Sequence, residues 1–171
     1  FLLDRNEQFY FMEMNTRIQV EHPVTECVTG IDLIKEQIRI AAGKKLSYRQ
    51  QDVRIGGHAI ECRINAENPK EQFRPSPGLI TDVYFPGGKG VRIDTAVYNG
   101  YEVPAYYDSM LAKLIVHAKT RKEAISKMRS ALGEVIIEGV DTNVDYQYEI
   151  MNHPDYQAGN VDIEFISEKM C

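Results

Sequence analysis

Polar side chains recur at every second position between residues 13 and 21 of this chain. They are Glu13, Asn15, Arg17, Gln19 and Glu21. In extended backbone, successive side chains point to opposite faces, so all of these groups would share one face. An ordinary solvated strand shows the same alternation. A row that mixes carboxylates, amides and a guanidinium is nevertheless more typical of a surface that binds a ligand, so the row is a candidate site.

Each residue type in this row suits a particular chemistry. Glu13 and Asn15 could supply hard oxygen ligands to Mg²⁺. Arg17 offers a planar fork that matches a carboxylate, phosphate or bicarbonate oxyanion. Glu21 would hold a carboxylate close to that guanidinium, where it is suited to take a proton. The row therefore predicts chemistry on an oxyanion beside a metal ion.

Short elements are expected around this row. Residues 1–3 and 8–14 are apolar runs separated by a polar turn, which predicts a hairpin. Residues 31–42 carry apolar side chains at helical spacing, and Gly43 follows where a left-handed residue would end that helix. Residues 44–54 are polar and without periodicity, which indicates a connection between two structural units.

Strand patterns dominate the rest of the chain. The expected strands are 58–65, 79–85, 91–97, 110–118, 135–137 and 162–166. The glycine-rich segment 86–90 would join two of them as a hairpin. Thr120 and Glu123 predict a capping box, and the helix behind it would bury Ala124, Ile125, Met128, Ala131 and Leu132. With a further helix at 144–151, clustered strands and appended helices predict an α+β fold.

Composition excludes several classes of protein. Twenty Lys and Arg against 25 Asp and Glu give a net charge of −5, so no basic surface indicates nucleic-acid binding. No apolar stretch approaches the roughly 20 residues that cross a bilayer, and no export signal is visible. The three cysteines (Cys27, Cys62 and Cys171) never form a CxxC pair, which favours a reducing, cytoplasmic compartment. The chain begins with Phe-Leu-Leu, which reads as a segment of a longer polypeptide.

Several long segments carry a specific likeness to a known family. They are FYFMEMNTRIQVEHPVTE, GHAIECRINAE, RPSPGLIT, PGGKGVRIDT, VPAYYDSMLAKLIV and EGVDTNVDYQ, and they span nearly the whole chain. In these segments the chain resembles biotin carboxylases, which are ATP-grasp enzymes. The resemblance implies the C-terminal part of an ATP-grasp domain at residues 1–44 and a connection at 45–56. The biotin carboxylase C-terminal domain would follow at 57–171, as antiparallel strands with appended helices.

The resemblance implies roles at the nucleotide. Glu13 and Asn15 match family positions at the metal and the ATP phosphates. Leu2 and Ile163 match apolar walls of the adenine pocket. The family's glycine-rich loop, phosphate-binding lysines and second metal-binding glutamate would lie before Phe1. We therefore expect this chain alone to be catalytically incomplete.

The resemblance also implies roles at the other substrates. Arg17, Gln19 and the backbone of Val20 match the bicarbonate pocket. Glu21 matches the base that deprotonates bicarbonate for its attack on the γ-phosphate. Arg63 matches the arginine that stabilises the enolate-like form of biotin. From its pattern alone, Arg63 would instead be an ordinary ion-pair partner on a strand.

Other matched positions concern assembly. Arg92 and Asp108 match positions at or near the family's dimer contact, although Asp108 could equally be a turn residue. Lys89 stands where an aromatic residue is frequent in the family, and Ser167 stands where many relatives carry an acid.

The implied activity converts bicarbonate, ATP and carrier-bound biotin into N-carboxybiotin, ADP and phosphate, with Mg²⁺ or Mn²⁺ as the metal. The implied partners are a biotin carboxyl carrier protein, a carboxyltransferase component and a second copy of the full-length protein. A biotin carboxylase subunit of acetyl-CoA carboxylase, which serves fatty acid biosynthesis, fits best among such enzymes. Two alternatives remain open: another ATP-grasp ligase such as a carbamoyl-phosphate synthetase, and a non-catalytic folding or dimerisation module.

Overall fold

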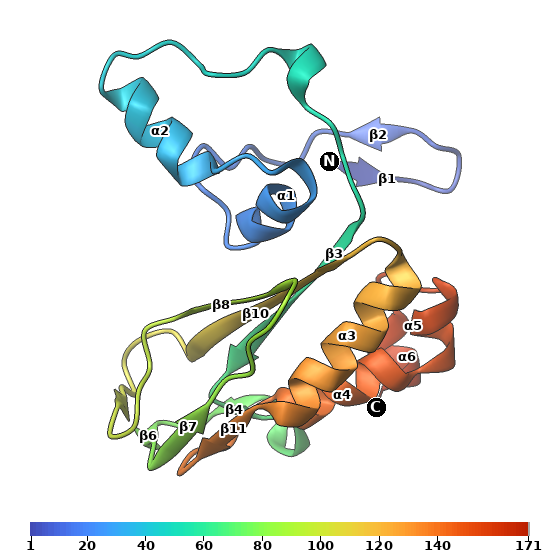
Figure 1. Cartoon of the computed structure of the whole chain (residues 1–171). Helices are drawn as coiled ribbons and strands as arrows, with labels where there is room; N and C mark the ends of the chain where they lie inside the picture. Colours follow the sequence, from blue (N-terminus) through green and yellow to red (C-terminus); the bar gives the residue numbers. More distant parts are fainter. Residues whose placement is uncertain (171) are drawn as a thin grey trace.

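A three-stranded antiparallel sheet forms the centre of the computed structural model, which describes residues 1–170. Its strands, in spatial order, are β3 (His58–Asn65), β10 (Met110–Ala118) and β8 (Val91–Thr95). Helix α3 (Arg121–Glu134) packs on β3 and β10, and α1 (His22–Thr29) contacts the same two strands. Figure 1 shows α3 alongside the sheet and α1 near the beginning of β3. The α+β prediction is confirmed.

Alternation along the strands gives the sheet one apolar face and one charged face. Ile60, Cys62 and Ile64 of β3 are buried with Leu114 and Val116 of β10 in the core cluster that includes the apolar side of α3. The charged residues alternate with them along the strands and are Glu61, Arg63, Arg92, Asp94 and Lys113. Because neighbouring side chains on a strand point to opposite faces, one register places both sets.

A β-bulge interrupts the pairing of β10 with β3. Met110 lies opposite Asn65 and Ala112 lies opposite Ile64, so Leu111 is an extra residue on β10. Leu111 is buried in a second apolar cluster, whose other buried members are Ala66, Ile80 and Val103. The bulge therefore lets one strand contribute to both apolar clusters.

Helix α3 follows the sequence prediction closely. The Thr120 hydroxyl accepts a hydrogen bond from the Glu123 amide at 3.2 Å, as an N-cap does. The Glu123 carboxylate accepts from the Lys119 amide, one residue earlier than in the predicted capping box. The predicted apolar face of α3 is buried, at Ala124, Ile125, Met128, Ala131 and Leu132.

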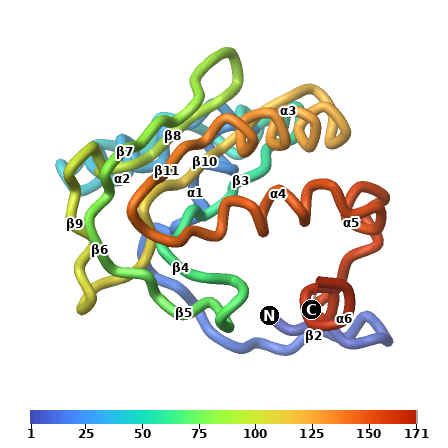
Figure 2. Tube along the Cα trace, turned by 90° about the horizontal axis from the view of Figure 1, so that it is seen from below, coloured from blue at the N-terminus to red at the C-terminus, as the bar shows by residue number. Residues whose placement is uncertain are grey.

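Three further helices follow α3. They are α4 (Val144–Asn152), α5 (Pro154–Ala158) and α6 (Phe165–Lys169). Helix α4 lies beside α3, and Figure 2 shows α5 and α6 continuing beyond it towards the C-terminus. The Phe165 ring packs edge-on against His153 at 5.1 Å between centroids, which attaches α6 to the residue that begins α5.

Short antiparallel pairs complete the second half of the chain. Strand β7 (Asp82–Tyr84) pairs with β11 (Ile136–Glu138). The other pairs are β4 (Glu67–Asn68) with β5 (Arg74–Pro75) and β6 (Gly78–Leu79) with β9 (Glu102–Val103). A short 3₁₀ helix, η2 (Pro69–Glu71), lies between β4 and β5.

The first third of the chain has little buried surface. Strands β1 (Leu2–Leu3) and β2 (Phe9–Tyr10) form the expected hairpin. Helix α2 (Leu33–Ala41) follows α1, and η1 (Gln50–Asp52) lies in the segment that leads to β3. Among residues 1–58, only Pro23 and Glu36 are buried. This region is thus a set of short elements without an apolar core of its own.

Two pairing predictions are wrong. Segment 86–90 does not join a hairpin, because β7 pairs with β11 while β8 pairs with β10. Residues 162–166 do not form a strand, because the chain turns at Asp162 and enters helix α6. In the first case the strands exist, but their partners are set by contacts distant in sequence. In the second case the apolar residues Phe165 and Ile166 belong to a short helix instead of a strand.

Two local predictions near the candidate site are also wrong or incomplete. Residues 13–19 lie in irregular backbone, so the row of polar residues is not presented by a strand. Helix α1 was not anticipated, and it begins directly after Glu21.

The described cysteines and helices bear on the composition argument. Cys27 and Cys62 are free thiols, and Cys171 lies outside the described residues. Burial raises the pKa of the Cys62 thiol to about 12, so this side chain belongs to the core. Over residues 1–170, no helix has both the length and the apolar character needed to traverse a bilayer.

Candidate functional site

Two residues distant in sequence meet at the start of α1. Glu21 is the N-cap residue of α1, and Arg63 lies on the charged face of β3. Arg63 Nη2 donates to Glu21 Oε2 at 2.8 Å, while the two side chains remain 49% and 54% exposed. An ion pair this exposed contributes little stability. Because both side chains are about half exposed, a ligand can reach them. The family resemblance implies a chemical role for each of the two residues.

A row of charges crosses the sheet beneath this ion pair. Arg63 of β3 lies opposite Lys113 of β10, and Lys113 lies opposite Asp94 of β8. Lys113 Nζ is 3.4 Å from Asp94 Oδ2 and donates to the Val20 carbonyl at 3.2 Å. The row thus contacts the segment that carries Glu21 as well as Arg63.

A second contact fixes α1 to the sheet. Arg92 Nη1 donates to Glu26 Oε2 at 2.6 Å, and its Nε and Nη2 donate to the Asp94 carboxylate at 2.8 and 2.9 Å. The hydrogen bonds from Arg92 lower the pKa of Asp94, against a smaller opposing effect of burial. Glu26 Oε1 also accepts from the Leu33 amide at 2.8 Å, so one carboxylate joins α1, the beginning of α2 and the sheet.

Glu61 is the most buried charge of this face. Its side chain is 5% exposed, and its Oε1 lies 3.9 Å from Arg63 Nε. Burial raises the pKa of Glu61, while Lys113 and Arg63 oppose the rise. Its Oε2 is buried without a hydrogen-bond partner among residues 1–170. Arg63 consequently has an exposed carboxylate on one side and a buried one on the other.

The structure brings the polar row only partly together. Glu13, Asn15 and Arg17 are exposed in irregular backbone, and Arg17 Nη1 donates to the Ile18 carbonyl at 3.2 Å. Gln19 is partly buried, and its Nε2 is buried without a partner in the described part of the chain. An orphaned donor beside Val20 and Glu21 is an observation that favours an acceptor ligand at this point.

Glu13 and Asn15 are the candidate metal ligands of the polar row. Their side chains are adjacent, with Asn15 Nδ2 at 3.4 Å from Glu13 Oε1. Residues 1–170 contain no group of three or more His, Cys, Asp or Glu that could hold an ion. Mg²⁺ keeps several waters and usually relies on substrate phosphates with one or two carboxylates. The pair fits such a partial site, with a carboxylate and an amide oxygen on exposed backbone.

The remaining predicted residues are dispersed. Leu2 lies in the β1–β2 hairpin, and Ile163 is 100% exposed in the segment before α6. Figure 1 shows the hairpin and α6 on separate parts of the molecule. Arg92 is engaged in the internal ion pairs described above. Asp108 accepts from the Met110 amide at 2.8 Å, which matches its alternative interpretation as a turn residue.

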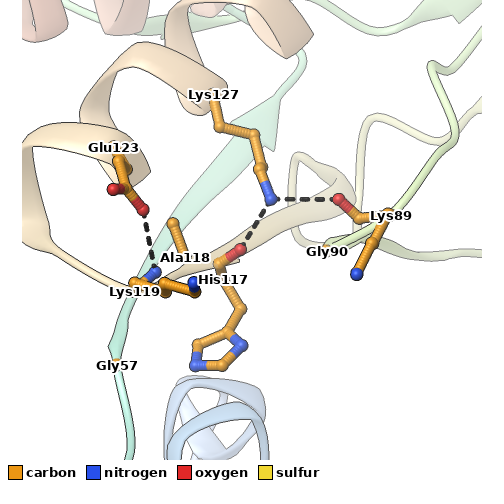
Figure 3. Close-up of a pocket in the computed structure, with 8 residues that line it drawn as sticks. All are labelled: Gly57, Lys89, Gly90, His117, Ala118, Lys119, Glu123 and Lys127. Carbon is orange, nitrogen blue, oxygen red and sulfur yellow. Dashed lines mark hydrogen bonds between the residues drawn. The ribbon is translucent and has the colours of Figure 1, made fainter.

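A separate pocket of about 870 Å³ lies where β3 begins and β10 ends (Figure 3). Lys127 Nζ donates there to the carbonyls of Lys89 and His117, at 3.0 and 2.8 Å. The pocket is lined by Gly57, Lys89, Gly90, His117, Ala118, Lys119, Glu123 and Lys127. Arg63 is six residues from Gly57 along β3, roughly 20 Å at the rise of a strand. The pocket is therefore distinct from the Glu21–Arg63 site.

Sequence reasoning missed two charges of the site, Lys113 and Asp94. Glu61 shares a face of the alternating strand with Arg63, where the sequence pattern already suggested an ion pair. Lys113 is the single charge in the apolar strand MLAKLIVHA, and such a residue must find a partner when it is buried. The sequence alone therefore indicated that Lys113 would need a partner. Its actual partners depend on strand register and on the position of α1, which the sequence alone did not predict.

Comparisons with known proteins agree with this geometry. The family model for the biotin carboxylase C-terminal domain matches residues 61–168, and the model for the carbamoyl-phosphate synthase L chain, ATP binding domain, matches residues 1–49. Fold and site thus define the end of an ATP-binding domain followed by a biotin carboxylase C-terminal domain. The chain belongs to the biotin carboxylase family. A carbamoyl-phosphate synthetase is not favoured, because that model covers the first segment alone.

Individual relatives are similar over almost the whole chain. Biotin carboxylase of Allochromatium vinosum is 58% identical over 98% of this chain and 37% of its own length. Biotin carboxylase 1 of Bacillus subtilis is 56% identical over 97% of this chain and 37% of its length. The chain therefore spans little more than a third of these relatives.

A solved structure has the same arrangement. The biotin carboxylase domain of Hydrogenobacter thermophilus 2-oxoglutarate carboxylase, crystallised as a dimer with MgADP, ADP and bicarbonate, has a TM-score of 0.94 and 51% identity. The match covers 96% of this chain and 36% of that one.

Proposed function

We propose that this chain is the C-terminal part of a biotin carboxylase, which uses ATP and bicarbonate to carboxylate biotin on a carrier protein. The observation that carries the proposal is the ion pair between Glu21 and Arg63 at 2.8 Å. It joins the segment matched by the ATP-binding model to the segment matched by the biotin carboxylase model. The base for bicarbonate and the cation for biotin would thus be adjacent side chains.

The bicarbonate pocket would consist of Arg17, Gln19, the backbone of Val20, and Glu21. The unpartnered Gln19 Nε2 supports this assignment, because a buried donor costs free energy until it meets an acceptor. Glu21 would take the proton of bicarbonate, and the resulting anion would attack the γ-phosphate of ATP. Glu21 suits this role because its carboxylate is half exposed and fixed at a helix N-terminus.

Arg63 would act in the second half-reaction. Carboxyphosphate would break down to CO₂ and phosphate, the phosphate would take the proton of the ureido N–H, and the ureido nitrogen would attack CO₂. Negative charge would build on the ureido oxygen as that proton leaves. A guanidinium at that oxygen stabilises the charge as it develops. Arg63 would exchange Glu21 for the ureido oxygen while Glu61 stays beside it.

Glu13 and Asn15 would bind the metal that accompanies ATP, and Leu2 and Ile163 would contact the adenine. Mg²⁺, or Mn²⁺ in its place, supplies charge neutralisation at the β- and γ-phosphates. The dispersed positions of Leu2 and Ile163 are compatible with an adenine pocket only if other parts of a longer chain complete it.

The proposal extends to organisation and partners. The ATP-grasp part would end at residue 44, a connection would run from 45 to 56, and the C-terminal domain would occupy 57–171. The full-length protein would form a dimer near Arg92 and Asp108, and would work with a biotin carboxyl carrier protein and a carboxyltransferase in the cytoplasm. Acetyl-CoA is the acceptor system that we favour, although relatives serve pyruvate and 2-oxoglutarate carboxylases.

The direct test measures two half-reactions of the full-length protein. Glu21→Gln should abolish bicarbonate-dependent ATP cleavage with nucleotide affinity unchanged, because the carboxylate acts on bicarbonate. Arg63→Ala should slow biotin carboxylation by about 10²–10³-fold and spare biotin-independent ATP hydrolysis. Glu134→Gln, an exposed carboxylate on α3, is the matched control. Wild-type turnover in Glu21→Gln would contradict the proposal, and biotin-independent turnover alone would favour another ATP-grasp ligase.

Residues 1–171 by themselves should show no biotin-dependent ATP turnover. Phosphoryl transfer requires the nucleotide to be held by backbone amides and a lysine, with metal between its phosphates. Here Glu13 and Asn15 lie on an exposed segment. Calorimetric titration with MgATP and a phosphate-release assay test this expectation. Turnover would show that this part is catalytically sufficient, and tight binding would show that it holds MgATP without further residues; either result contradicts the expectation.

A further inference from the structure

Lys113 is a buried cation that the proposed mechanism does not use. Its side chain is 12% exposed in the middle of β10, between the buried Ala112 and Leu114. Burying an ammonium is costly, and an apolar side chain of similar size would fill such a position at less cost. The groups around Lys113 must therefore explain why a lysine occupies this position.

The surroundings of the ammonium are specific. Nζ donates to the carbonyl of Val20 at 3.2 Å and pairs with Asp94 at 3.4 Å. It interacts electrostatically with Glu61, and it lies opposite Arg63 across the strand pair. Two carboxylates thus stabilise its charge, while its remaining contact is with a backbone carbonyl in the segment proposed to bind bicarbonate.

That carbonyl belongs to the peptide unit between Val20 and Glu21. Because a peptide bond is planar, fixing the Val20 oxygen also fixes the direction of the Glu21 amide and the position of the Glu21 Cα, from which the side chain projects. The other hydrogen bonds of this turn are local: the His22 amide and ring Nδ1 lie 3.2 and 2.7 Å from the Gln19 carbonyl oxygen, and the α1 N-cap has no side-chain hydrogen bond. Lys113 adds a hydrogen bond that joins the backbone of this turn to the sheet.

We propose that Lys113 is a positioning residue for bicarbonate, which holds the Val20–Glu21 peptide over Arg63 without touching the substrate. This inference rests on the proposed function. The sheet supplies a rigid base at Lys113 and Arg63, and the hydrogen bond to Val20 transfers that rigidity to the base-bearing residue. Without it, Glu21 keeps its chemistry but samples more positions relative to Arg63 and to bicarbonate.

The test compares Lys113→Met with Lys122→Met in the full-length protein. Lys122 is exposed on α3 and distant from Val20, so it controls for the loss of a lysine. In Lys113→Met the KM for bicarbonate should rise by about tenfold, the equivalent of one charge-assisted hydrogen bond, while the KM for ATP stays unchanged. Hydrogen exchange at the amides of residues 20–22 should accelerate in Lys113→Met alone. Lys113→Arg, which keeps the charge and the donors, should recover most of the bicarbonate affinity.

The outcomes separate this inference from the proposed function. An unchanged bicarbonate KM and unchanged exchange in Lys113→Met, with Glu21→Gln inactive, overturn the positioning role alone. Full bicarbonate-dependent ATP cleavage in Glu21→Gln overturns the proposed function. If Lys113→Met does not fold, Lys113→Leu takes its place, because leucine also removes the donor to the Val20 carbonyl. Equal rises of the bicarbonate and ATP KM in that variant, or no rise, would contradict the inference.

Discussion

Residues 1–58 and residues 59–170 are held in place by different forces. The second region contains both apolar clusters, with buried side chains from β3, β10 and α3. The first region buries only Pro23 and Glu36, and it contacts the sheet through ion pairs and hydrogen bonds such as Glu26–Arg92. Most of the residues proposed for chemistry lie in the first region. Their geometry therefore depends on the charged face of a sheet that the second region stabilises.

This difference has a consequence for dynamics. Segments with few buried apolar contacts open locally at low free energy, and ligand-binding segments are commonly drawn from them. A bicarbonate site built on such a segment can open and close while the domain beneath it stays folded. The four predictions below test whether the contrast between the two regions holds, in order of decreasing effect.

The largest effect is expected in the core of the second region. Leu114→Ala should reduce the free energy of unfolding by about 2–5 kcal/mol, because Leu114 is fully buried and its loss leaves a cavity. Leu46→Ala, at an exposed leucine of the first region, should change it by less than about 0.5 kcal/mol. Urea unfolding of both variants measures the contrast, and equal losses would show that the first region has a core of its own.

Two glycines with similar backbone angles test the junction between the regions. Gly57 and Gly43 have φ of 74° and 75°, so alanine is strained at both by about 1 kcal/mol. A Cβ at Gly57 would lie 2.3 Å from the Ala118 carbonyl oxygen, whereas nothing lies within 4 Å of one at Gly43. Gly57→Ala should therefore cost about 1–3 kcal/mol more than Gly43→Ala. Thermal melts of the two variants provide the comparison. Equal decreases in Tm would mean that the backbone around Gly57 moves to accommodate the added Cβ.

The ion-pair network predicts a dependence on pH. Arg92 lowers the pKa of Asp94 in the folded chain, so the pairing contributes stability above the unfolded-state value of about 3.9. That stability is lost as the pH falls through the lower folded value. Asp94→Asn should be about 1 kcal/mol less stable near pH 7, and the deficit should disappear in acid. Unfolding curves from pH 7 to pH 2 test this, with Glu134→Gln as the control. A deficit independent of pH would assign the effect to packing.

The smallest effect is expected at the N-terminal hairpin. The Phe9 ring meets the Phe1 ring edge-on at 5.8 Å between centroids, but both side chains are exposed. Phe9→Ala should therefore change the free energy of unfolding by less than about 0.5 kcal/mol, although it should speed proteolysis before residue 15. A loss of several kcal/mol would show that the hairpin is integrated with the domain.

The sequence predicted those parts in which local pattern and tertiary packing agree. The nine-residue strand β10 has the expected bounds, and the helix after Thr120 buries the expected side chains. Helix α1 was missed because its sequence HPVTECVT is short, rich in β-branched residues, and has only Val24, Cys27 and Val28 at helical spacing. Its position depends on Glu26 and Arg92, which are 66 residues apart.

The candidate site was predictable in membership but not in geometry. Family resemblance pointed to both Glu21 and Arg63, yet their pairing over 42 residues of sequence follows from no spacing rule. The polar row suggested one shared strand face, whereas only its end, from Gln19 to Glu21, lies against the sheet. Lys113 was overlooked because a lysine in a strand is ordinarily solvated, and only the covering segment makes it buried.

The bulge at Leu111 determines where β10 can gain or lose a residue without a change in the register of its pairing with β3. A residue inserted between Ala112 and Lys113 would shift the register of the following residues by one and turn Lys113 towards α3 and Leu114 towards α1. Deleting Leu111 itself would restore regular pairing and leave the residues beyond it in place, at the cost of one member of the second cluster. Viable length variants among natural or engineered homologues should consequently be found at the bulge, and those elsewhere in the strand should be eliminated by selection.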